Sequence, residues 1–186
     1  MGLLTSAEID EMGFKSVGSN VRLSNKASFY NCQNISIGNN VRIDDFCVLS
    51  AGVGGIEIGN YIHIAVYSSL IGAGRISLSD FSNISSRVAI YSSNDDYSGD
   101  FMTNPMVPAE LTHVTHADVF VGKHVIIGSG TVVLPGVTLE EGVAIGALSF
   151  VNKSCKEYGI YSGVPAKRIK DRERGVKELE LKVYGS

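Results

Sequence analysis

The stretch that decides the fold is residues 121–151, VGKHVI-IGSGTV-VLPGVT-LEEGVA-IGALSF-V, in which an aliphatic residue returns at every sixth position. The hexads begin at Val121, Ile127, Val133, Leu139, Ile145 and Val151, and their fifth places hold Val125, Thr131, Val137, Val143, Ser149 and Cys155. A period of six matches neither the 3.6-residue helical repeat nor simple strand alternation. Each hexad is therefore predicted to be a short strand followed by a turn, and three hexads make one triangular coil.

The same phase runs through most of the chain upstream. Its starts are Ile37, Ile43, Leu49, Ile58, Ile64, Leu70, Leu78, Ile84 and Ile90. Equivalent coils begin 18 residues apart from Val121 to Leu139, but 21 apart from Ile37 to Ile58 and 20 from Ile58 to Leu78, so short bulges are expected near residues 52–57 and 72–76. Coils of this kind stack their strands in parallel about 4.8 Å apart over one buried aliphatic column. The predicted fold is an all-β parallel β-helix covering residues 16–165.

Both ends of the predicted single domain, residues 1–186, carry helical patterns. Residues 1–15 form a cap, in which Ser6 precedes a short helix with acidic residues in its first turn. Residues 166–186 are charge-rich with spaced apolar residues, Ile169, Val176, Leu179 and Leu181, and are predicted to be an amphipathic C-terminal helix. Such helices cover the open edges of a sheet.

The composition is that of one globular domain, with 186 residues and a formal net charge of -3. Nothing in it points to nucleic acid. The chain contains no apolar run of 18 residues and no basic start followed by an apolar stretch, so neither a membrane span nor a secretory signal is predicted, and the expected location is the cytoplasm. Cys32, Cys47 and Cys155 are expected to be reduced core thiols, and no metal-ligand spacing is present.

The repeat is broken between Ile90 and Val121, where roughly 25 residues beyond one normal coil are expected to leave the stack as a loop over residues 92–117. A long loop on a rigid scaffold commonly carries function. Its polar residues are Asn94, Asp95, Asp96, Tyr97, Asp100, Glu110, His113 and His116. A solvated surface loop is the alternative interpretation of these residues.

These features resemble the hexapeptide-repeat acyltransferases, including the galactoside, maltose and xenobiotic O-acetyltransferases, over residues 15–170. The resemblance implies a left-handed β-helix, an acyl-CoA donor, no metal, and a homotrimer whose active sites lie between subunits. It also implies a catalytic histidine near the start of the loop, in a stretch like Thr-Gly-His-Pro. The corresponding stretch here is Ser93-Asn94-Asp95-Asp96, which puts Asp95 in the place of the histidine.

An aspartate at this place favours an amine over a hydroxyl as the acceptor. Acylation of a hydroxyl requires a well-placed base, because the hydroxyl pKa lies far above neutrality. An amine on a sugar has a pKa of about 8, so roughly a tenth is already neutral at pH 7 and reaching that form costs about 1.4 kcal/mol. A carboxylate can bind the ammonium form, orient it, and collect a proton after attack.

The segments YSSNDDYSG (91–99) and MTNP (102–105) resemble the acyltransferases that modify nucleotide-linked amino-deoxysugars for surface polysaccharide, particularly dTDP-4-amino-4,6-dideoxyhexoses. The predicted function is acyl-CoA-dependent N-acylation of such a sugar. An O-acetyltransferase of galactoside or xenobiotic type is the alternative, and would use His113 or His116 as base. A non-catalytic scaffold of the carbonic-anhydrase type would need three metal-binding histidines, an arrangement that the four histidines here do not offer.

The site residues follow from this resemblance. The catalytic candidates are Asp95, Asp96 and Ser85, and the substrate-binding candidates are Asn94, Arg75, Tyr97, Glu110 and His113. Arg75 stands in a bulge where the galactoside enzymes place an aspartate; it is predicted to contact a nucleotide diphosphate, with an exposed salt bridge as the alternative.

The donor half is closer to the family pattern. The resemblance assigns coenzyme A to Ser129, Gly130, Ala147, Asn152, Lys153, Lys167, Arg168 and Lys170. Small residues let an extended pantetheine approach the strand edges, and clustered cations suit a phosphate. The backbone amide of Gly130 is also a candidate donor to the oxyanion of the tetrahedral intermediate. Filling of the repeat is the alternative role for Ser129 and Ala147.

Overall fold

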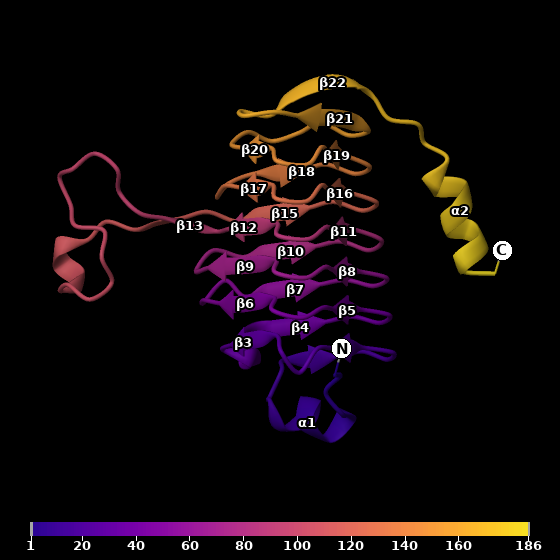
Figure 1. The fold of residues 1–186 in the computed structure, drawn as a ribbon, viewed down its shortest axis with the longest axis horizontal. Helices are drawn as coiled ribbons and strands as arrows, with labels where there is room; N and C mark the ends of the chain where they lie inside the picture. Colours follow the sequence, from indigo (N-terminus) through magenta and orange to yellow (C-terminus); the bar gives the residue numbers. More distant parts are fainter. Residues whose placement is uncertain (1, 186) are drawn as a thin grey trace.

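The computed structural model describes residues 2–185 as a stack of triangular coils whose three faces are sheets of parallel strands, apart from one antiparallel strand at the end of the second sheet (Figure 1). The first sheet contains β1 (Ser16–Val17), β4 (Ile35–Ile37), β7 (Ile56–Ile58), β10 (Ile76–Leu78), β15 (Val119–Val121) and β18 (Thr138–Leu139). The second contains β2 (Arg22–Leu23), β5 (Arg42–Ile43), β8 (His63–Ile64), β11 (Asn83–Ile84), β16 (Ile126–Ile127), β19 (Ala144–Ile145), β21 (Gly159–Ser162) and β22 (Lys167–Asp171). The third contains β3 (Ser28–Tyr30), β6 (Val48–Ala51), β9 (Ser69–Gly72), β12 (Ala89–Tyr91), β17 (Val132–Val133) and β20 (Phe150–Val151).

Three edges separate these faces. We call the turns between the first and second sheets the first edge (for example residues 79–82), those between the second and third sheets the second edge (85–88), and those between the third and first sheets the third edge (72–75). The long loop leaves the stack at the third edge, after β12. Every functional position can therefore be located by its coil and its edge.

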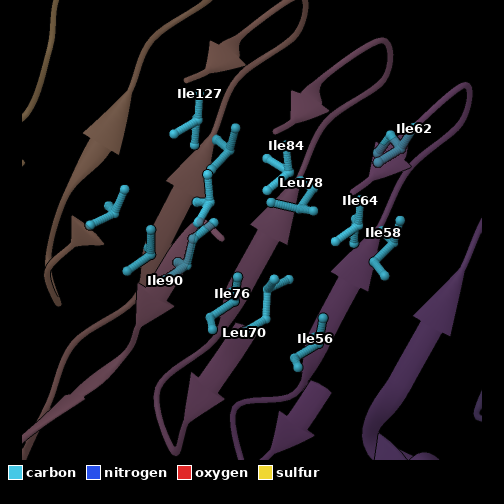
Figure 2. Close-up of a cluster of buried hydrophobic side chains, with 14 of the residues drawn as sticks. Ile56, Ile58, Ile62, Ile64, Leu70, Ile76, Leu78, Ile84, Ile90 and Ile127 are labelled. Carbon is cyan, nitrogen blue, oxygen red and sulfur yellow. The ribbon is translucent and has the colours of Figure 1, made fainter. Parts of the chain in front are cut away.

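The predicted aliphatic column forms the core. The register pairs Leu78 with Ile58 and Val121, and Ile84 with Ile64 and Ile127, so each hexad start lies on the start of the next coil. Figure 2 shows side chains of this column pointing into the interior of the prism from successive strands, among them Ile58, Ile64, Leu78, Ile84 and Ile127. The prediction of an all-β parallel β-helix with an extruded loop and a C-terminal helix is confirmed.

Glycines at the third edge leave the space that the two stems of the loop occupy. Gly72 has a φ of +146°, and a Cβ there would lie 2.8 Å from backbone atoms of Ser92. A Cβ on Gly74 would lie 2.9 Å from backbone atoms of both Ser92 and Ala117, the two residues where the loop leaves and rejoins the coil. The predicted bulge at residues 72–76 thus packs its glycines under both stems of the loop.

Bulky residues as well as asparagine adopt the left-handed conformation in the turns of the coils. Positive φ angles occur at Asn20 and Asn40, but also at Phe46, Tyr61, Tyr67, Phe81, Arg87, His124, Leu148 and Tyr158. Non-glycine residues are uncommon in this left-handed region, and bulky ones especially so. Stacking between neighbouring coils compensates for this cost, since the rings of Tyr61 and Phe81 lie 4.8 Å apart with only 4° between their planes.

The N-terminal cap helix, α1, covers Ser6–Glu11. Its N-cap is Thr5 rather than the expected Ser6: the Glu8 amide donates to Thr5 Oγ1, and the Thr5 amide donates to the Glu8 carboxylate. This reciprocal capping box satisfies two backbone donors at once. Ile9 is the buried residue of the helix, and it joins the core beneath the first coil.

The C-terminal helix is shorter than predicted. Residues 167–171 form β22, antiparallel to β21, and α2 covers only Val176–Val183. The unpaired backbone groups of β21 at the end of the stack offer ordered hydrogen bonds to the returning chain, whereas Gly175 disfavours continuation of a helix. Met1 and Ser186, which the predicted segments include, lie outside the described residues.

α2 descends beside the first edge of the coils (Figure 1). Tyr184 places its ring edge-on to Tyr61 and Phe81, and Glu180 binds Lys123 and His124. His124 is consequently only 7% exposed, although it lies in a turn of the repeat. The helix that sequence assigned to the open edge of a sheet instead covers a row of turns.

Cys32, Cys47 and Cys155 are free and buried, as expected for core thiols. Burial raises the pKa of Cys47 and of Cys155 to about 11, which keeps both protonated at neutral pH. Within residues 2–185, no helix is long and apolar enough to cross a membrane, and no group of three His, Cys, Asp or Glu residues could hold a metal ion.

Candidate active site

A short antiparallel ribbon closes the base of the long loop. β13 (Ser93–Asn94) pairs with β14 (Thr115–His116), which places Ser93 opposite His116. Ser93 Oγ lies 2.8 Å from His116 Nδ1 and accepts a hydrogen bond of 2.7 Å from the Ala73 amide. The ribbon fixes where the loop begins, and therefore where the residues after Asn94 lie.

Asp95 stands directly after this ribbon, is exposed, and borders two cavities. The first, about 300 Å³, lies between the loop base and the coil and is lined by Tyr91, Ser93, Asn94, Asp95, Tyr97, Val132 and Leu134. The second, about 370 Å³, lies within the loop and is lined by Asp95, Thr103, Asn104, Pro105, Val107, Ala109, Thr112 and Val114. Because Asp95 borders both cavities, its carboxylate can contact a ligand group that is bound in either of them.

Asp96, the neighbouring candidate, turns into the loop. Its carboxylate accepts hydrogen bonds from the Ser98 amide at 2.8 Å and the Ser98 hydroxyl at 2.5 Å, and lies 3.5 Å from His113 Nδ1. The hydroxyl of Ser98 is the main reason that the pKa of Asp96 lies below its usual value. His113 also contacts the ring of Phe101, with centroids 4.9 Å apart. Asp96 and His113 thus bind each other inside the loop, and Asp95 is the carboxylate left facing the cavities.

The other predicted substrate contacts are scattered. Asn94 and Tyr97 line the cavity beside Asp95. Glu110 lies in a short 3-10 helix, Ala109–Leu111, and is exposed. Arg75 lies at the third edge, where its guanidinium is 3.4 Å from the Asp118 carboxylate and its amide donates to the same group at 2.8 Å. The exposed salt bridge that was the alternative for Arg75 is therefore present.

Ser85 does not lie beside Asp95 within one chain. It begins the second-edge turn after β11, whereas Asp95 follows the third edge beyond β12, so the two residues sit at opposite ends of a strand of the third sheet. The Ser85 amide donates to the Ile127 carbonyl at 3.0 Å, and its carbonyl accepts from the Ser68 hydroxyl at 2.9 Å. These contacts fix the Ser85 backbone and leave its half-buried side chain at the surface of the edge.

The predicted donor residues occupy the upper coils. Ser129 and Ala147 are exposed in successive turns of the second edge, in the two coils above the turn that contains Ser85 and Ser86. Asn152 and Lys153 are exposed at the third edge, and Lys167, Arg168 and Lys170 are exposed on β22 at the end of the stack. Arg168 is paired with Asp171 at 2.5 Å. The small residues thus form a continuous row along one edge, and the cations gather near its upper end.

The proposed oxyanion role of Gly130 is wrong, because its amide is already used. With a φ of +73°, Gly130 donates its N–H to the Ser86 carbonyl at 3.0 Å in the coil below. An amide that holds neighbouring coils together does not point at an acyl carbonyl. This hydrogen bond follows from the stacking of one coil on the next. Comparison of motifs alone does not reveal it.

Sequence reasoning missed Val132 and Leu134 in the wall opposite Asp95. The signal was present in the repeat, because the register places Val133 on Ile90, the last hexad start before the loop. Residues on either side of Val133 therefore had to line the coil surface next to the loop base. The Ser93–His116 pair had no such signal, since 22 intervening residues separate its members.

Comparisons with known proteins agree with this geometry. No family model matches the chain. A dTDP-4-amino-4,6-dideoxy-D-glucose acyltransferase of Escherichia coli is 61% identical over 180 residues, covering 97% of this chain and 94% of that protein.

Solved structures of acyltransferases are also similar to this chain. AntD, an N-acyltransferase from Bacillus cereus in complex with dTDP and 3-hydroxybutyryl-CoA, superposes with a TM-score of 0.93 at 46% identity and covers all of both chains. Variants of AntD with one aspartate or one serine replaced have also been solved with dTDP and coenzyme A. A maltose O-acetyltransferase from Clostridium difficile, with a TM-score of 0.61 and 21% identity over 90% of this chain and 75% of its own, shares the fold.

The E. coli relative is similar over nearly the whole of both chains, and this similarity shows the family. The chain is an acyl-CoA-dependent acyltransferase and belongs to the family of the dTDP-4-amino-4,6-dideoxy-D-glucose acyltransferases.

Proposed function

We propose that this chain transfers an acyl group from acyl-CoA to the 4-amino group of dTDP-4-amino-4,6-dideoxyglucose, with Asp95 as the carboxylate that binds the amine. The observation that carries the proposal is the exposed Asp95 between two cavities, at the place where the O-acetyltransferases have a histidine. The E. coli relative bears the name of this activity, and a variant of AntD has been solved with this amino sugar and coenzyme A.

Asp95 binds the acceptor in its ammonium form and orients it. Loss of one proton gives the neutral amine, which attacks the thioester carbonyl and forms a tetrahedral intermediate. When the C–S bond breaks, the amide forms and the coenzyme A thiolate leaves. The ammonium group loses two protons in total: one passes to solvent before attack, and the other, lost after attack, is taken up by the thiolate. Because the sugar amine has a pKa of about 8, this reaction does not require a strong base.

The histidines of the loop support N-acylation over the O-acylation alternative. His113 is engaged with Asp96, and His116 lies against Ser93 in the ribbon. Neither is placed at the border of both cavities, where Asp95 stands. A hydroxyl acceptor would need such a histidine to remove its proton.

The donor follows the upper part of the second edge in this proposal. The pantetheine contacts the backbone at Ser129, Gly130 and Ala147. It runs towards Asn152 and Lys153, which lie on the third edge and therefore, like Asp95, come from the neighbouring copy in this proposal. Lys167, Arg168 and Lys170 provide positive charge for the adenosine phosphates. The exposure of these positions, apart from the half-buried Gly130, supports the assignment.

The functional unit is a homotrimer with active sites between subunits. Ser85 and Asp95 lie on different edges of one prism, so a site that uses both needs Ser85 from one copy and Asp95 from another. Ser85 would then hydrogen-bond to the sugar amine or its proton. The solved AntD variants at one aspartate and one serine concern the same two residue types.

The reaction takes place in the cytoplasm in this proposal, where acyl-CoA and nucleotide-linked sugars are made. The acylated sugar remains attached to its nucleotide, which is an activated form for glycosyl transfer. The product is therefore a building block for a surface polysaccharide or another glycan.

The first experiment measures thiol release from acetyl-CoA and 3-hydroxybutyryl-CoA with dTDP-4-amino-4,6-dideoxyglucose, a galactoside and chloramphenicol. We expect turnover with the amino sugar, and a loss of about 100-fold in kcat/KM for Asp95→Asn. Asp100→Asn is the matched control, since Asp100 is an exposed aspartate of the same loop that lines neither cavity. Turnover of the hydroxyl acceptors instead, with Asp95→Asn unaffected, contradicts the proposal.

A second experiment tests the shared site. Ser85→Ala and Asp95→Asn chains, each poorly active alone, are co-expressed with different tags and the mixed oligomer is purified. Each purified mixed trimer has one intact site of three, so activity should return to about a third of wild type. Failure of the mixed oligomer to regain activity shows that each copy uses its own Ser85 and Asp95.

A further inference from the structure

The proposed catalytic carboxylate, Asp95, is hydrogen-bonded to the coils only through the base of the long loop. Figure 1 shows the loop projecting from the stack beyond β13. Among residues 2–185, the hydrogen bonds and ion pairs of residues 95–114 all stay within residues 94–114. The orientation of Asp95 therefore depends on the ribbon of β13 and β14 at the loop base.

This ribbon is too small to keep its geometry by backbone pairing alone. It contains two residue pairs, Ser93 with His116 and Asn94 with Thr115. An isolated two-stranded ribbon is at best marginally stable in water. Contacts between side chains must therefore help to fix the two stems of the loop relative to each other and to the coil.

The hydroxyl of Ser93 connects three segments. Its oxygen accepts a hydrogen bond of 2.7 Å from the Ala73 amide in the bulge of the third edge, and lies 2.8 Å from Nδ1 of His116. Because the oxygen already accepts from Ala73, the single hydroxyl proton is available to be donated to Nδ1. This arrangement assigns the ring proton of neutral His116 to Nε2, since Nδ1 must be the acceptor.

Ser92, the preceding residue, has a different role. Its buried hydroxyl donates to the Gly74 carbonyl at 2.7 Å, and its carbonyl accepts from the Ala117 amide at 3.0 Å. These contacts attach the stems to the coil at the point where the loop leaves and rejoins it. The contact between Ser93 and His116 lies one residue further out and joins the two stems to each other.

The joined stems lie next to the proposed chemistry. Ser93 and Asp95 both line the cavity of about 300 Å³, so the hydroxyl held by His116 and the carboxylate border the same space. A reacting group has to be held within about 0.5 Å of its productive position, and a misplacement of about 1 Å can lower the rate about 100-fold. A shift of the stems would move Asp95 directly, because only Asn94 separates it from Ser93.

We propose that His116 is a positioning residue for acyl transfer: by accepting the hydrogen bond of the Ser93 hydroxyl, it locks the ribbon and fixes the Asp95 carboxylate against the acceptor amine. This inference rests on the proposed function and adds to it a residue that acts through Ser93. His116 takes no proton from the substrate. A hydrogen-bond acceptor at the place of Nδ1 is all that its role requires.

The test compares His116→Leu, which has no acceptor, with His116→Asn, whose amide oxygen can replace Nδ1 but cannot act as a base. We expect kcat with the amino sugar to fall about tenfold or more in His116→Leu, with the KM for acetyl-CoA unchanged. His116→Asn should keep most of the wild-type kcat. Ser93→Ala should resemble His116→Leu, and the two changes combined should lower kcat no further than the more severe single change.

Thr115→Val is the matched control. It removes a hydroxyl from the other residue pair of the same ribbon, where Thr115 Oγ1 donates to the Asn94 carbonyl at 3.3 Å. Its kcat should stay within about twofold of wild type. The coenzyme A Kd, measured by titration calorimetry, should be unchanged in all variants, which shows that the coils remain folded.

A measurement on the wild-type enzyme avoids any folding defect of the variants. The chain has four histidines, so their ring nitrogens can be resolved by NMR after labelling with 15N-histidine. The resonances of His116 are those that disappear in His116→Asn. At about pH 8.5, where ordinary imidazole side chains are neutral, they should show a proton on Nε2 and none on Nδ1. A proton on Nδ1 overturns the proposal.

Three further outcomes overturn the positioning role while leaving the proposed function intact. The first is a wild-type kcat in His116→Leu. The second is a kcat as low in His116→Asn as in His116→Leu with coenzyme A binding retained, which would show that the imidazole itself is needed. The third is an equal loss in Thr115→Val, which would assign the effect to the ribbon as a whole. Absence of turnover of the amino sugar by the wild-type enzyme rejects the proposed function, and this inference with it.

Discussion

The coils above the loop and those below it are built from the same hexad but differ in regularity. Above the loop, hexad starts follow at every sixth residue from Val121 to Val151, and β16 to β20 are two residues each. Below it, third-sheet strands reach four residues, and glycine bulges at the third edge pack under the loop stems. The regular half presents an even row of small residues, which is the proposed donor site, and the irregular half makes room for the loop. In this repeat protein, the loop with the proposed catalytic residue Asp95 lies where the chain departs from the repeat.

Gly72→Ala should have the largest effect on stability, because it removes the space on which the irregular half depends. The new Cβ would meet Ser92 backbone atoms at 2.8 Å and would impose a φ of +146° on an alanine. We expect a loss of at least about 3 kcal/mol in the free energy of unfolding.

Gly13→Ala is the control for this substitution, because Gly13 has a φ of +70° with nothing within 4 Å of the new Cβ. It should cost only about 1 kcal/mol, measured by urea denaturation. Equal losses for the two alanines would show that the contact with the loop stem is unimportant.

Ile64→Ala and Ile127→Ala compare the cores of the two halves. Both side chains are fully buried hexad starts of the second sheet, on either side of Ile84. Each should cost about 3 kcal/mol, because both leave a similar cavity. Two separate unfolding transitions, each sensitive to one of the substitutions, would instead show that the halves unfold independently.

The docking of α2 should weaken in acid. The hydrogen bond from Lys123 is the main reason that the pKa of Glu180 lies below its usual value of 4.5. A carboxylate whose pKa is lower in the folded state stabilises the fold fully above its unfolded pKa, and this contribution is lost as the pH falls through the folded pKa. Helix docking should therefore be constant from pH 7 to about pH 5 and decline below pH 4.5.

Glu180→Gln should show the loosened state at neutral pH. Trypsin cleavage after Arg172 or Arg174 should become a few-fold faster than in wild type, because opening of the tail precedes cleavage. Glu178→Gln, an exposed change in the same helix, is the control. Equal cleavage rates in all three proteins would mean that the ion pairs of Glu180 do not hold α2.

Arg75→Gln should have the smallest effect. Its ion pair with Asp118 is exposed on both sides, and such pairs contribute less than about 1 kcal/mol. We expect a nearly unchanged melting temperature and an unchanged KM for the amino sugar. A rise in that KM with stability unaffected would restore the predicted contact of Arg75 with the nucleotide diphosphate.

The repeated parts of the fold were predictable, because every hexad has the same pattern, an aliphatic residue at its start. The core column, the bulges and the loop boundaries all follow from the positions of residues such as Ile84, Ile90 and Val121. The end of the repeat was harder. Local composition favoured a helix through Ile169, but hydrogen bonds to the exposed edge of β21 decided the outcome.

The site was predictable only in part for the same reason. Comparison with a familiar loop singled out Asp95, but could not separate it from Asp96, because the partners Ser98 and His113 are chosen by the fold of the loop. The use of the Gly130 amide by Ser86 and the burial of His124 under α2 are likewise contacts between segments far apart in sequence. A short sequence motif does not reveal roles that depend on contacts between segments far apart in the chain.

β22 also determines how the molecule behaves at high concentration. An unfinished parallel sheet is a template on which another chain could add a strand, and stacked coils are especially suited to end-to-end growth. This last strand runs antiparallel to its neighbour and carries Lys167, Arg168, Lys170 and Asp171 at exposed positions. The strand that brings cations to the proposed donor site therefore also discourages the coils from growing into fibres.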